Sequence, residues 1–414
     1  IEASLRRLTH YDYWQERLRK CILCDSGADL IVYGMGELPT ADLCRLLDDK
    51  LLHGREEQTV SVADFRNLLR KYPIRQTVML ERKENIPGGI REDDIVLHSH
   101  EESILHPEKH AENFRHIEEE SNKLQPQRIL QPVDGMYAVV NPPYPPMTTE
   151  QIDRSFDFPY TRLPHPKYRG KRIPAYEMIK FSVCLHRGCF GGCAFCTISA
   201  HQGKFIMSRS RASILREVRQ IVKMAGFKGY LSDLGGPSAN MYGMHGKDLQ
   251  LCRRCKRPSC IHPAVCSNLD ADHRPLLEIY RAVDALPGIK KSFIGSGVRY
   301  DLLLHEYKDE RLRRAAQEYT RELILHHVSG RLKVAPEHTS DRVLRLMRKP
   351  SFRQFREFKR IFDRINCEAG LNQQLIPYFI SSHPGCKAED MAELAVQTKD
   401  MDFHLEQVQD FTPT

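Results

Sequence analysis

The sequence predicts an α/β fold built from alternating strands and helices. Six short apolar segments recur between residues 177 and 410, and amphipathic helical patterns lie between them. Alternation of this kind is typical of parallel β/α units joined by right-handed crossovers. With 28% charged and 41% hydrophobic residues, the chain has the composition of a folded protein that buries a core. A membrane span needs about 20 apolar residues in a row, and because no run approaches that length we expect no membrane partner.

Residues 1–140 are predicted to form an N-terminal α/β region. We expect an amphipathic helix over 4–21, a strand over 29–33 and a helix over 40–52. The Glu- and His-rich stretch 98–123 predicts an exposed helix. Residues 141–176 carry many prolines, which predicts a long ordered segment that connects two lobes.

Residues 177–414 are predicted to form the β/α core. The expected strands cover 177–183, 229–234, 291–295, 332–335, 373–380 and 404–410. The expected helices cover 212–225, 276–286, 310–325, 341–347 with 353–364, and 388–401. Ser340 is a plausible N-cap, and Pro275 occupies a first helical position. Six such units form an open barrel or a doubly wound sheet, and in both architectures ligands bind at the carboxyl ends of the strands.

Cysteine usage indicates metal ligands in a reducing compartment. Eight of the 13 cysteines lie between residues 184 and 266. An odd total in a long chain that opens without the pattern of a signal peptide argues against a disulfide framework. We therefore expect a cytoplasmic protein that uses thiolates to bind metal.

The most informative motif follows the first expected strand. Cys189, Cys193 and Cys196 have the spacing CxxxCxxC. Three close thiolates suit a cubane iron–sulfur cluster, and they leave one of its irons free to chelate a small molecule. Gly191 and Gly192 allow a tight backbone around such a cluster. A three-ligand zinc site and buried free thiols are the alternatives.

This spacing, with the aromatic Phe195 before the third cysteine, resembles the radical S-adenosylmethionine (SAM) superfamily. The resemblance implies that Cys189, Cys193 and Cys196 hold a 4Fe–4S cluster whose open iron binds SAM. It also implies reductive cleavage of SAM to a deoxyadenosyl radical that acts on a substrate. The electron would come from a donor such as flavodoxin or ferredoxin.

Further segments at the ends of expected strands resemble the SAM contacts of that superfamily. Gly235-Gly236-Pro237 resembles its GGE segment with Pro in place of Glu, so backbone carbonyls would meet the SAM amino group. Ser296 and Arg299 follow the third strand, where Arg could pair with the SAM carboxylate, although a solvated Arg is equally consistent. Glu337 could accept from the ribose hydroxyls or cap a helix. Ile380 could flank the adenine or pack in the core.

Four segments together resemble one family of this superfamily, the YgiQ family: residues 159–166, 173–177, 187–193 and 334–338. The resemblance implies a partial (β/α)6 TIM-like radical SAM barrel over 177–414 and a Rossmann-like lobe within 1–140. It also leads us to expect an internal fragment of a longer protein. The family's substrate is unassigned. The DxHxxG segment that binds cobalamin in some related lobes does not occur in this chain.

A second cysteine cluster occupies an insertion at 252–266. Cys252, Cys255, Cys260 and Cys266 place four thiols within 15 residues. Four thiolates saturate one tetrahedral zinc ion, which slightly favours zinc over an auxiliary iron–sulfur cluster, and free thiols are a third possibility. The basic residues between the first three cysteines are consistent with contact to phosphate, as in RNA, or with a solvated surface.

Three hypotheses for function follow from these motifs. The first is a radical SAM enzyme that acts on an unknown substrate, either a small molecule or RNA. The second is a nucleic-acid-binding module with two zinc sites and no catalysis. The third is an electron-transfer protein, which would contain iron but would not cleave SAM.

Overall fold

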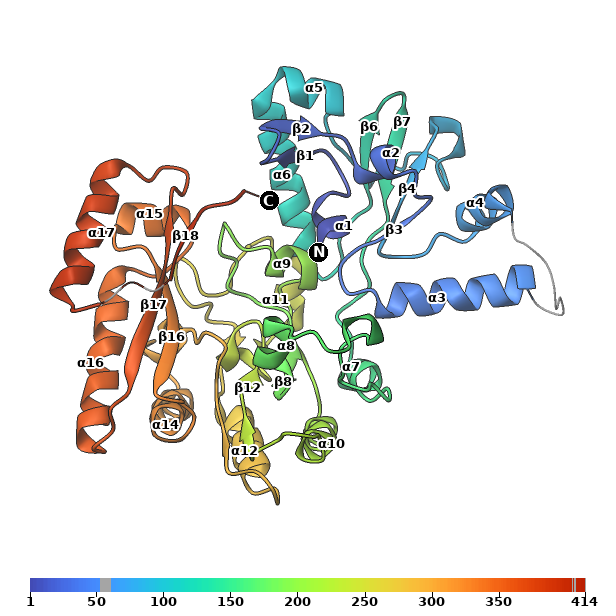
Figure 1. Ribbon diagram of the computed structural model, residues 1–414. Coiled ribbons are helices and arrows are strands. Elements are labelled where there is room, and N and C mark those ends of the chain that lie inside the picture. The colour runs from blue at the N-terminus through green and yellow to red at the C-terminus, as the bar shows by residue number, and fades with distance from the viewer. Residues whose placement is uncertain (53–60, 404, 406, 414) are drawn as a thin grey trace.

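The structure, a computed structural model, describes residues 1–52, 61–403, 405 and 407–413. Residues 1–140, called the N-terminal lobe below, lie at the top and right of Figure 1. Residues 177–413, called the β/α region, fill the lower part and the left side. The connecting residues 141–176 contain helix α7 (Thr149–Phe156), a 3-10 turn (Pro166–Tyr168) and helix α8 (Pro174–Ile179).

The N-terminal lobe is built on a five-stranded sheet in the order β3-β4-β7-β6-β5. Its strands are β3 (Ile31–Val32), β4 (Thr77–Glu81), β5 (Ile95–Val96), β6 (Ile129–Val133) and β7 (Met136–Val140). Only β5 and β6 pair in parallel, and the other three pairings are antiparallel. The expected Rossmann-like lobe is therefore wrong for the described residues, because a Rossmann sheet is mostly parallel.

The predicted helix over residues 4–21 is also wrong. The structure has helix α1 (Glu2–Leu5), a hairpin of β1 (His10–Asp12) and β2 (Arg17–Arg19), and then helix α2 (Ile22–Ser26). The Asp12 carboxylate accepts from the Gln15 backbone N–H at 3.0 Å. Such local side-chain bonds favour a turn over a helix.

The remaining helices of the lobe cover its sheet and its edge. They are α3 (Glu37–Leu47), which continues into a π-helical turn (Asp48–Leu52), α4 (Val62–Lys71), a 3-10 turn (Lys83–Asn85), α5 (His100–Leu105) and α6 (Pro107–Ser121). The single helix predicted over 98–123 is thus two helices. Proline disfavours the helical conformation of the residue before it, so Pro107 ends the first helix and starts the second.

The β/α region contains all six predicted strand segments, and every pairing among them is parallel. The strands are β8 (Ser182–Cys184), β11 (Tyr230–Leu231), β12 (Asp233–Gly235), β15 (Lys291–Ser292), β16 (Arg331–Glu337), β17 (Gln374–Ser381) and β18 (Gln407–Asp410). The first predicted strand is shorter than expected, since residues 174–179 form α8. Of the last one, residues 404 and 406 lie outside the described residues.

These strands are divided among three sheets. β8 pairs with β12, β11 pairs with β15, and the third sheet has the order β16-β17-β18. One backbone bond, from Ile294 N–H to His327 O at 2.9 Å, links the segment after β15 to the chain before β16. The fold is therefore mixed α/β, and the described residues form no closed barrel, so the TIM-like barrel is not confirmed.

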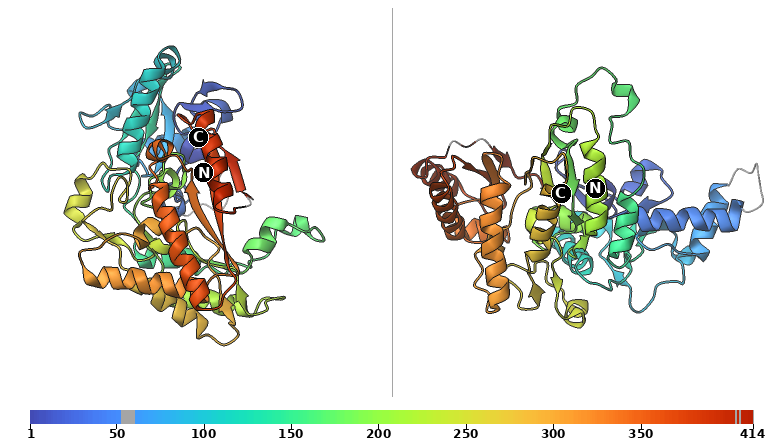
Figure 2. Two further views of the ribbon diagram at one scale, coloured as in Figure 1. Left: turned by 90° about the vertical axis from the view of Figure 1, so that its left-hand side faces the viewer. Right: turned by 90° about the horizontal axis from the view of Figure 1, so that it is seen from below.

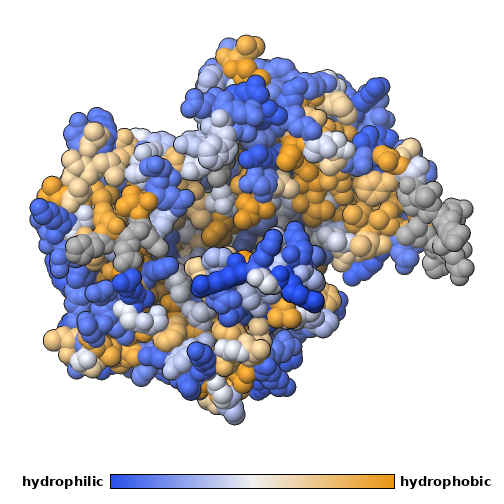
Figure 3. All heavy atoms as spheres, in the orientation of Figure 1, coloured by the Kyte–Doolittle hydropathy of each residue, from blue (hydrophilic) through white to orange (hydrophobic). Residues whose placement is uncertain are grey.

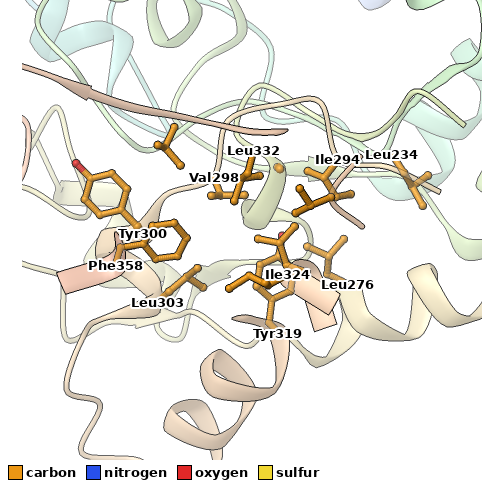
Figure 4. Close-up of a cluster of buried hydrophobic side chains, with 14 of the residues drawn as sticks. Leu234, Leu276, Ile294, Val298, Tyr300, Leu303, Tyr319, Ile324, Leu332 and Phe358 are labelled. Carbon is orange, nitrogen blue, oxygen red and sulfur yellow. The ribbon is translucent and has the colours of Figure 1, made fainter. Parts of the chain in front are cut away.

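The helices predicted between the strands form as expected. They are α10 (Arg211–Val222), α12 (Arg274–Asp284), α14 (Glu310–His326), α15 (Asp341–Leu346), α16 (Phe352–Glu368) and α17 (Ala388–Asp400), with the short α13 (Tyr300–Leu303) before α14. Their apolar faces meet the strands in one large core. Figure 4 shows part of it, where Leu234 of β12, Leu276 of α12 and Leu332 of β16 converge with side chains from α13, α14 and α16.

The two ends of the described chain lie close together in all three ribbon views (Figures 1 and 2). The first residues reach across to the β/α region, where the Ser4 hydroxyl hydrogen-bonds to His201 Nδ1 at 2.9 Å in helix α9 (Ile198–Gln202). Figure 3 shows the surface indented between the N-terminal lobe and the region of β16, β17 and β18. The chain thus places its N-terminal segment beside the carboxyl ends of the core strands.

Candidate functional site

The three-cysteine loop begins after β8 and the short strand β9 (His186–Arg187), which pairs with β10 (Met207–Ser208). The backbone N–H of Cys189 donates to Gly203 O at 3.1 Å, and the Ser199 hydroxyl donates to Cys189 O at 3.1 Å. The N–H of Cys196 donates to Cys193 O at 3.1 Å. These bonds fold residues 189–203 back on themselves, so all three cysteines lie on one short loop at the carboxyl end of the first strand.

The three thiols lie near enough to influence one another's ionisation. Burial raises the pKa of the Cys189 thiol to about 12, and the Cys193 and Cys196 thiols act in the same direction. Burial also raises the pKa of Cys196, again with a contribution from Cys193. Within the described residues, no group of three or more His, Cys, Asp or Glu side chains is arranged closely enough to hold a metal ion as it stands.

The residues around the thiols nevertheless fit an iron–sulfur cluster held by three cysteines. A Cβ at Gly191 would lie 2.7 Å from Arg299 Nη1 and 3.3 Å from Cys189 Sγ. Gly192 has a φ of +59°, and a Cβ there would lie 2.2 Å from Pro258 O. Only glycine fits at position 192, whereas a Cβ at position 191 would displace the Arg299 guanidinium from its place beside the thiols. The soft thiolate donors are those that iron–sulfur clusters use.

Arg299 lies directly against this loop. Its Nη1 donates to Cys193 Sγ at 3.5 Å, and its Nε donates to Asp301 Oδ1 at 2.9 Å. The residue is only 8% exposed, so the solvated Arg considered from the sequence is wrong. The pairing with Asp301 holds the guanidinium beside the cysteines.

Glu337, at the end of β16, brings a carboxylate to the same place. It is 5% exposed, and its Oε1 lies 3.5 Å from Lys349 Nζ. Burial raises the pKa of this carboxyl group, against the opposing charges of Lys349 and Arg299. Its charge in turn contributes to the raised pKa of Cys196. Oε2 is buried without a hydrogen-bond partner among the described residues, which leaves it available to a ligand.

The Gly235-Gly236-Pro237 segment begins with the last residue of β12, which pairs with β8. Its first carbonyl is already used, because Leu185 N–H donates to Gly235 O at 2.7 Å. A Cβ at Gly236 would lie 2.5 Å from the His186 ring, so a larger residue does not fit there. Contact between the carbonyls of Gly236 and Pro237 and the SAM amino group stays a prediction.

The other predicted SAM contacts have different surroundings. Ser296 donates its hydroxyl to Asp233, so it closes the turn after β15. The Phe195 ring meets His383 edge to face with their centroids 6.5 Å apart. Ile380 packs in the main core, where it is 6% exposed. Their contacts with SAM stay predictions.

The insertion with the second cysteine cluster packs on top of the first loop. The N–H of Cys260 donates to Phe190 O at 3.0 Å, and the Ser259 hydroxyl donates to the same carbonyl at 3.4 Å. Burial raises the pKa of Cys260 to about 11, opposed by the Lys204 charge, and the other three thiols of the cluster add to the rise. Cys252, Cys255, Cys260 and Cys266 are therefore neighbours, although no metal-binding arrangement was found in the described chain.

Two cations, Lys204 and Arg348, surround these loops, and of the two Arg348 was not predicted from the sequence. Lys204 is 3% exposed, and its Nζ donates to Arg257 O at 2.8 Å and lies 3.8 Å from Cys255 Sγ. Arg348 reaches across the lobes, with bonds of 2.5 and 2.9 Å to the Glu118 carboxylate of α6 and one of 3.4 Å to Gly192 O. A basic residue near a cysteine motif is a weak signal, because the partner is distant in sequence.

A cavity of about 230 Å³ lies between the N-terminal lobe and the first cysteine loop. One wall is the loop from Gly192 to Thr197, and the opposite wall comes from residues 5–11 and one face of α6. Phe411 and Pro413 lie at its edge. The cavity has Cys193 and Cys196 in its lining, so a molecule bound there would lie beside the cysteines.

The chain is similar to a known protein family. Residues 1–182 match the family model described as Radical SAM N-terminal. A UPF0313 protein of Bacteroides thetaiotaomicron is 68% identical over 415 residues, which cover 100% of this chain and 66% of the relative. UPF0313 proteins of Porphyromonas gingivalis and Shewanella oneidensis are 64% and 38% identical, with 100% of this chain and 63% and 57% of the relatives covered. The chain thus spans about two thirds of the nearer relatives' length.

The mixed α/β fold, the three-cysteine loop and the match of residues 1–182 to the Radical SAM N-terminal model together indicate a radical SAM protein. The chain belongs to the UPF0313 proteins, the YgiQ family. None of the helices in the described part of the chain combines the length and apolar character that crossing a membrane requires.

Proposed function

We propose that this chain carries the catalytic site of a radical SAM enzyme. Cys189, Cys193 and Cys196 would ligate a 4Fe–4S cluster, and the substrate would bind in the cavity that the loop borders. The observation that carries the proposal is the meeting of three half-buried thiols, the Arg299 guanidinium and the Glu337 oxygen that has no partner in the described chain, at the strand ends.

When bound, the cluster would chelate the amino and carboxylate groups of SAM at its open iron and supply the electron that cleaves the sulfonium C–S bond. Arg299, held by Asp301, would place a fixed positive charge beside the thiolates and the SAM carboxylate. Glu337 would accept hydrogen bonds from the ribose, since its Oε2 is buried and free. The remaining predicted contacts are Phe195, Gly235, Gly236, Pro237, Ser296 and Ile380.

The N-terminal lobe would exclude water and oxygen from the cavity beside the cysteines. The segment 5–11 and helix α6 form the wall opposite the cysteines, and the Arg348–Glu118 ion pair ties α6 to the loop. The proline-rich segment lies further away, since residues 143–147 line a neighbouring cavity instead. The N-terminal lobe would therefore form the lid of the site. Of the cysteine insertion, only Pro258 lines the cavity among the described residues.

A second metal site at Cys252, Cys255, Cys260 and Cys266 is part of the proposal, with zinc as its ion. The four thiols influence one another's ionisation, Asn268 Nδ2 donates to Cys252 Sγ at 3.4 Å, and the Lys204 cation offsets part of the charge of four thiolates. Zinc there would fix the loop that carries Ser259 and Cys260 onto Phe190, and thereby support the first loop.

The enzyme would need an electron donor and a reducing compartment. The cleavage step needs one electron from a donor such as flavodoxin or ferredoxin. All 13 cysteines are free thiols, which supports a reducing compartment, the cytoplasm. The substrate, a small molecule or RNA, is not identified by the site. Arg257, one of the basic residues of the insertion, donates to His262 O at 3.0 Å and so serves an internal contact.

The test is anaerobic reconstitution with iron and sulfide, followed by dithionite and SAM and an assay for deoxyadenosine. We expect a brown protein with about four irons per chain that forms deoxyadenosine. Cys193→Ala should lose the cluster and the product, whereas Cys184→Ala should keep both, because the Cys184 thiol donates to His186 O at 3.2 Å and has no role in the cluster.

The alternatives give different results in the same experiment. A colourless protein with two zinc ions would indicate the nucleic-acid-binding module. A brown protein that reduces reversibly but forms no deoxyadenosine would indicate the electron-transfer protein.

A further inference from the structure

Arg7 lies where two cavities meet between the lobes. The cavity beside the cysteine loop and a second one of about 120 Å³ share four lining residues, namely Arg7, Ser121, Ser199 and Ala200. Arg7 is 7% exposed, so its guanidinium is almost enclosed by protein and faces both cavities. A molecule that extends from the cysteines into the second cavity would pass this side chain.

The guanidinium of Arg7 has no carboxylate partner within the described chain. Its Nη1 donates to Ser4 O, and its central carbon lies 4.9 Å from the centre of the Tyr33 ring. Its Nε is buried without a hydrogen-bond partner among the described residues. Burial lowers the pKa of Arg7, because no carboxylate opposes the cost of desolvation. Buried arginines are ordinarily paired, so this one is suited to an anion from outside the chain.

Among the described charged side chains that line the cavity beside the cysteines, no unpaired carboxylate opposes Arg7. Glu118, the carboxylate in its lining, is already bound to Arg348 through two bonds. His10 and His110 line the same wall, and Nδ1 of His110 is buried without a partner. In the second cavity Glu120 is paired with Lys123. An anionic group would therefore meet Arg7 and polar ring nitrogens without an opposing free carboxylate.

We propose that Arg7 binds an oxyanion of the substrate, a carboxylate or a phosphate, and so orients the substrate against the cysteine loop. Arg7 lines both cavities and its Nε has no partner in the described chain, and the fork of N–H donors of a planar guanidinium matches both anions. The inference deepens the proposed function, on which it rests, by assigning the substrate to the class of anionic molecules.

Inorganic phosphate and acetate, titrated by calorimetry into the reconstituted protein at constant ionic strength, test the site directly. We expect saturable binding of at least one of the two anions, weakened at least tenfold in Arg7→Met and less in Arg7→Lys, which keeps the charge but loses the fork. Arg6→Met is the matched control, because Arg6 is exposed and bound to Glu2 at 2.7 Å, and it should bind like the wild type. Equal anion affinity in the wild type and Arg7→Met, or no binding by the wild type, would overturn the proposal. If Arg7→Met fails to fold, Arg7→Lys replaces it: weaker anion binding than in the wild type supports the proposal, and equal affinity overturns it.

A second readout separates a substrate anion from the carboxylate of SAM itself. Saturating SAM should leave the phosphate affinity of the reconstituted wild type unchanged, and displacement of phosphate by SAM would place both anions at one site. Loss of SAM binding in Arg7→Lys would likewise assign the anion to SAM and contradict the inference. The phosphate titration does not depend on SAM cleavage, so the inference and the proposed function can fail separately.

Discussion

The guanidinium of Arg299 donates from Nη1 to the Sγ of Cys193 at 3.5 Å. Asp301 holds the same side chain in place, because Arg299 Nε donates to Asp301 Oδ1 at 2.9 Å. Burial alone would raise the pKa of Asp301, but the charge and hydrogen bonds of Arg299 hold it below its ordinary value. A loop of three thiols at the strand ends is thus fixed by a cation from the third strand's loop, 106 residues further along the chain.

Arg299→Met should destabilise the protein, because it leaves the Asp301 carboxylate buried without its cation. Removing one partner of a buried pair costs about 3–5 kcal/mol. Urea unfolding at pH 7 measures the loss, and iron content measured in parallel should fall.

The double variant Arg299→Met with Asp301→Asn serves as its control. It removes the uncompensated charge, so much of the lost stability should return while the iron content stays low. Equal stabilities of the single and double variants would mean that the pair is unimportant.

Gly192→Ala should separate the first cysteine loop from the insertion. The added Cβ would lie 2.2 Å from Pro258 O at a φ of +59°, and forced packing with backbone strain should cost about 2–4 kcal/mol. We expect poor cluster incorporation, measured by iron and sulfide content. Gly297→Ala is the matched control, since a Cβ there meets nothing within 4 Å. Similar cluster contents in both variants would argue against the packing described here.

Cys260→Ser should lose one equivalent of zinc per chain, because it removes one of four thiolates from the insertion. Metal analysis by mass spectrometry after anaerobic purification measures this. The iron of the first cluster should be retained in part, since the variant keeps both bonds to Phe190 O, from the backbone N–H of residue 260 and from the Ser259 hydroxyl. Zinc content equal to that of the wild type would exclude the site, and loss of additional iron and sulfide instead of zinc would identify an auxiliary iron–sulfur cluster. Cys367→Ser, an exposed thiol on α16, is the control.

Stability should decrease in mild acid because of buried neutral histidines. Burial lowers the pKa of His273 to about 4, whereas the unfolded chain has a histidine pKa of about 6.5. The unfolded state therefore binds the proton first, and stability falls as the pH drops from about 6.5 to 4, by about 3 kcal/mol for this residue. Urea unfolding across that range should give a shallower pH dependence for His273→Asn than for the wild type. Identical slopes would contradict the burial effect.

The β/α region could be predicted in large part from the sequence. Strands such as 374–381 and helices such as 310–326 have strong apolar periodicity, and local patterns of this kind depend on neighbours within a few residues. The spacing of Cys189, Cys193 and Cys196 is also local. The arrangement of the strands into three sheets instead of one barrel depends on contacts distant in sequence, which periodicity does not contain.

The N-terminal lobe was predicted less well. The strands on either side of Asp134 and Gly135 were missed, although this dipeptide is a strong hairpin signal and both residues have positive φ in the structure. The contact of Arg348 with Glu118 could not be predicted, because it joins segments that become neighbours only when the lobes pack. The contact of Lys204 with Arg257 could not be predicted either, because the two residues are distant in sequence.

Mössbauer spectroscopy of the protein reconstituted with 57Fe tests the central claim most directly. The claim is a four-iron cluster with three cysteine ligands and one iron open to SAM. We predict that adding SAM changes the signal of one iron in four and leaves the other three unchanged, and that Cys193→Ala shows no such cluster. A cluster whose four irons are all insensitive to SAM, or a wild-type protein that binds only zinc, would contradict the account.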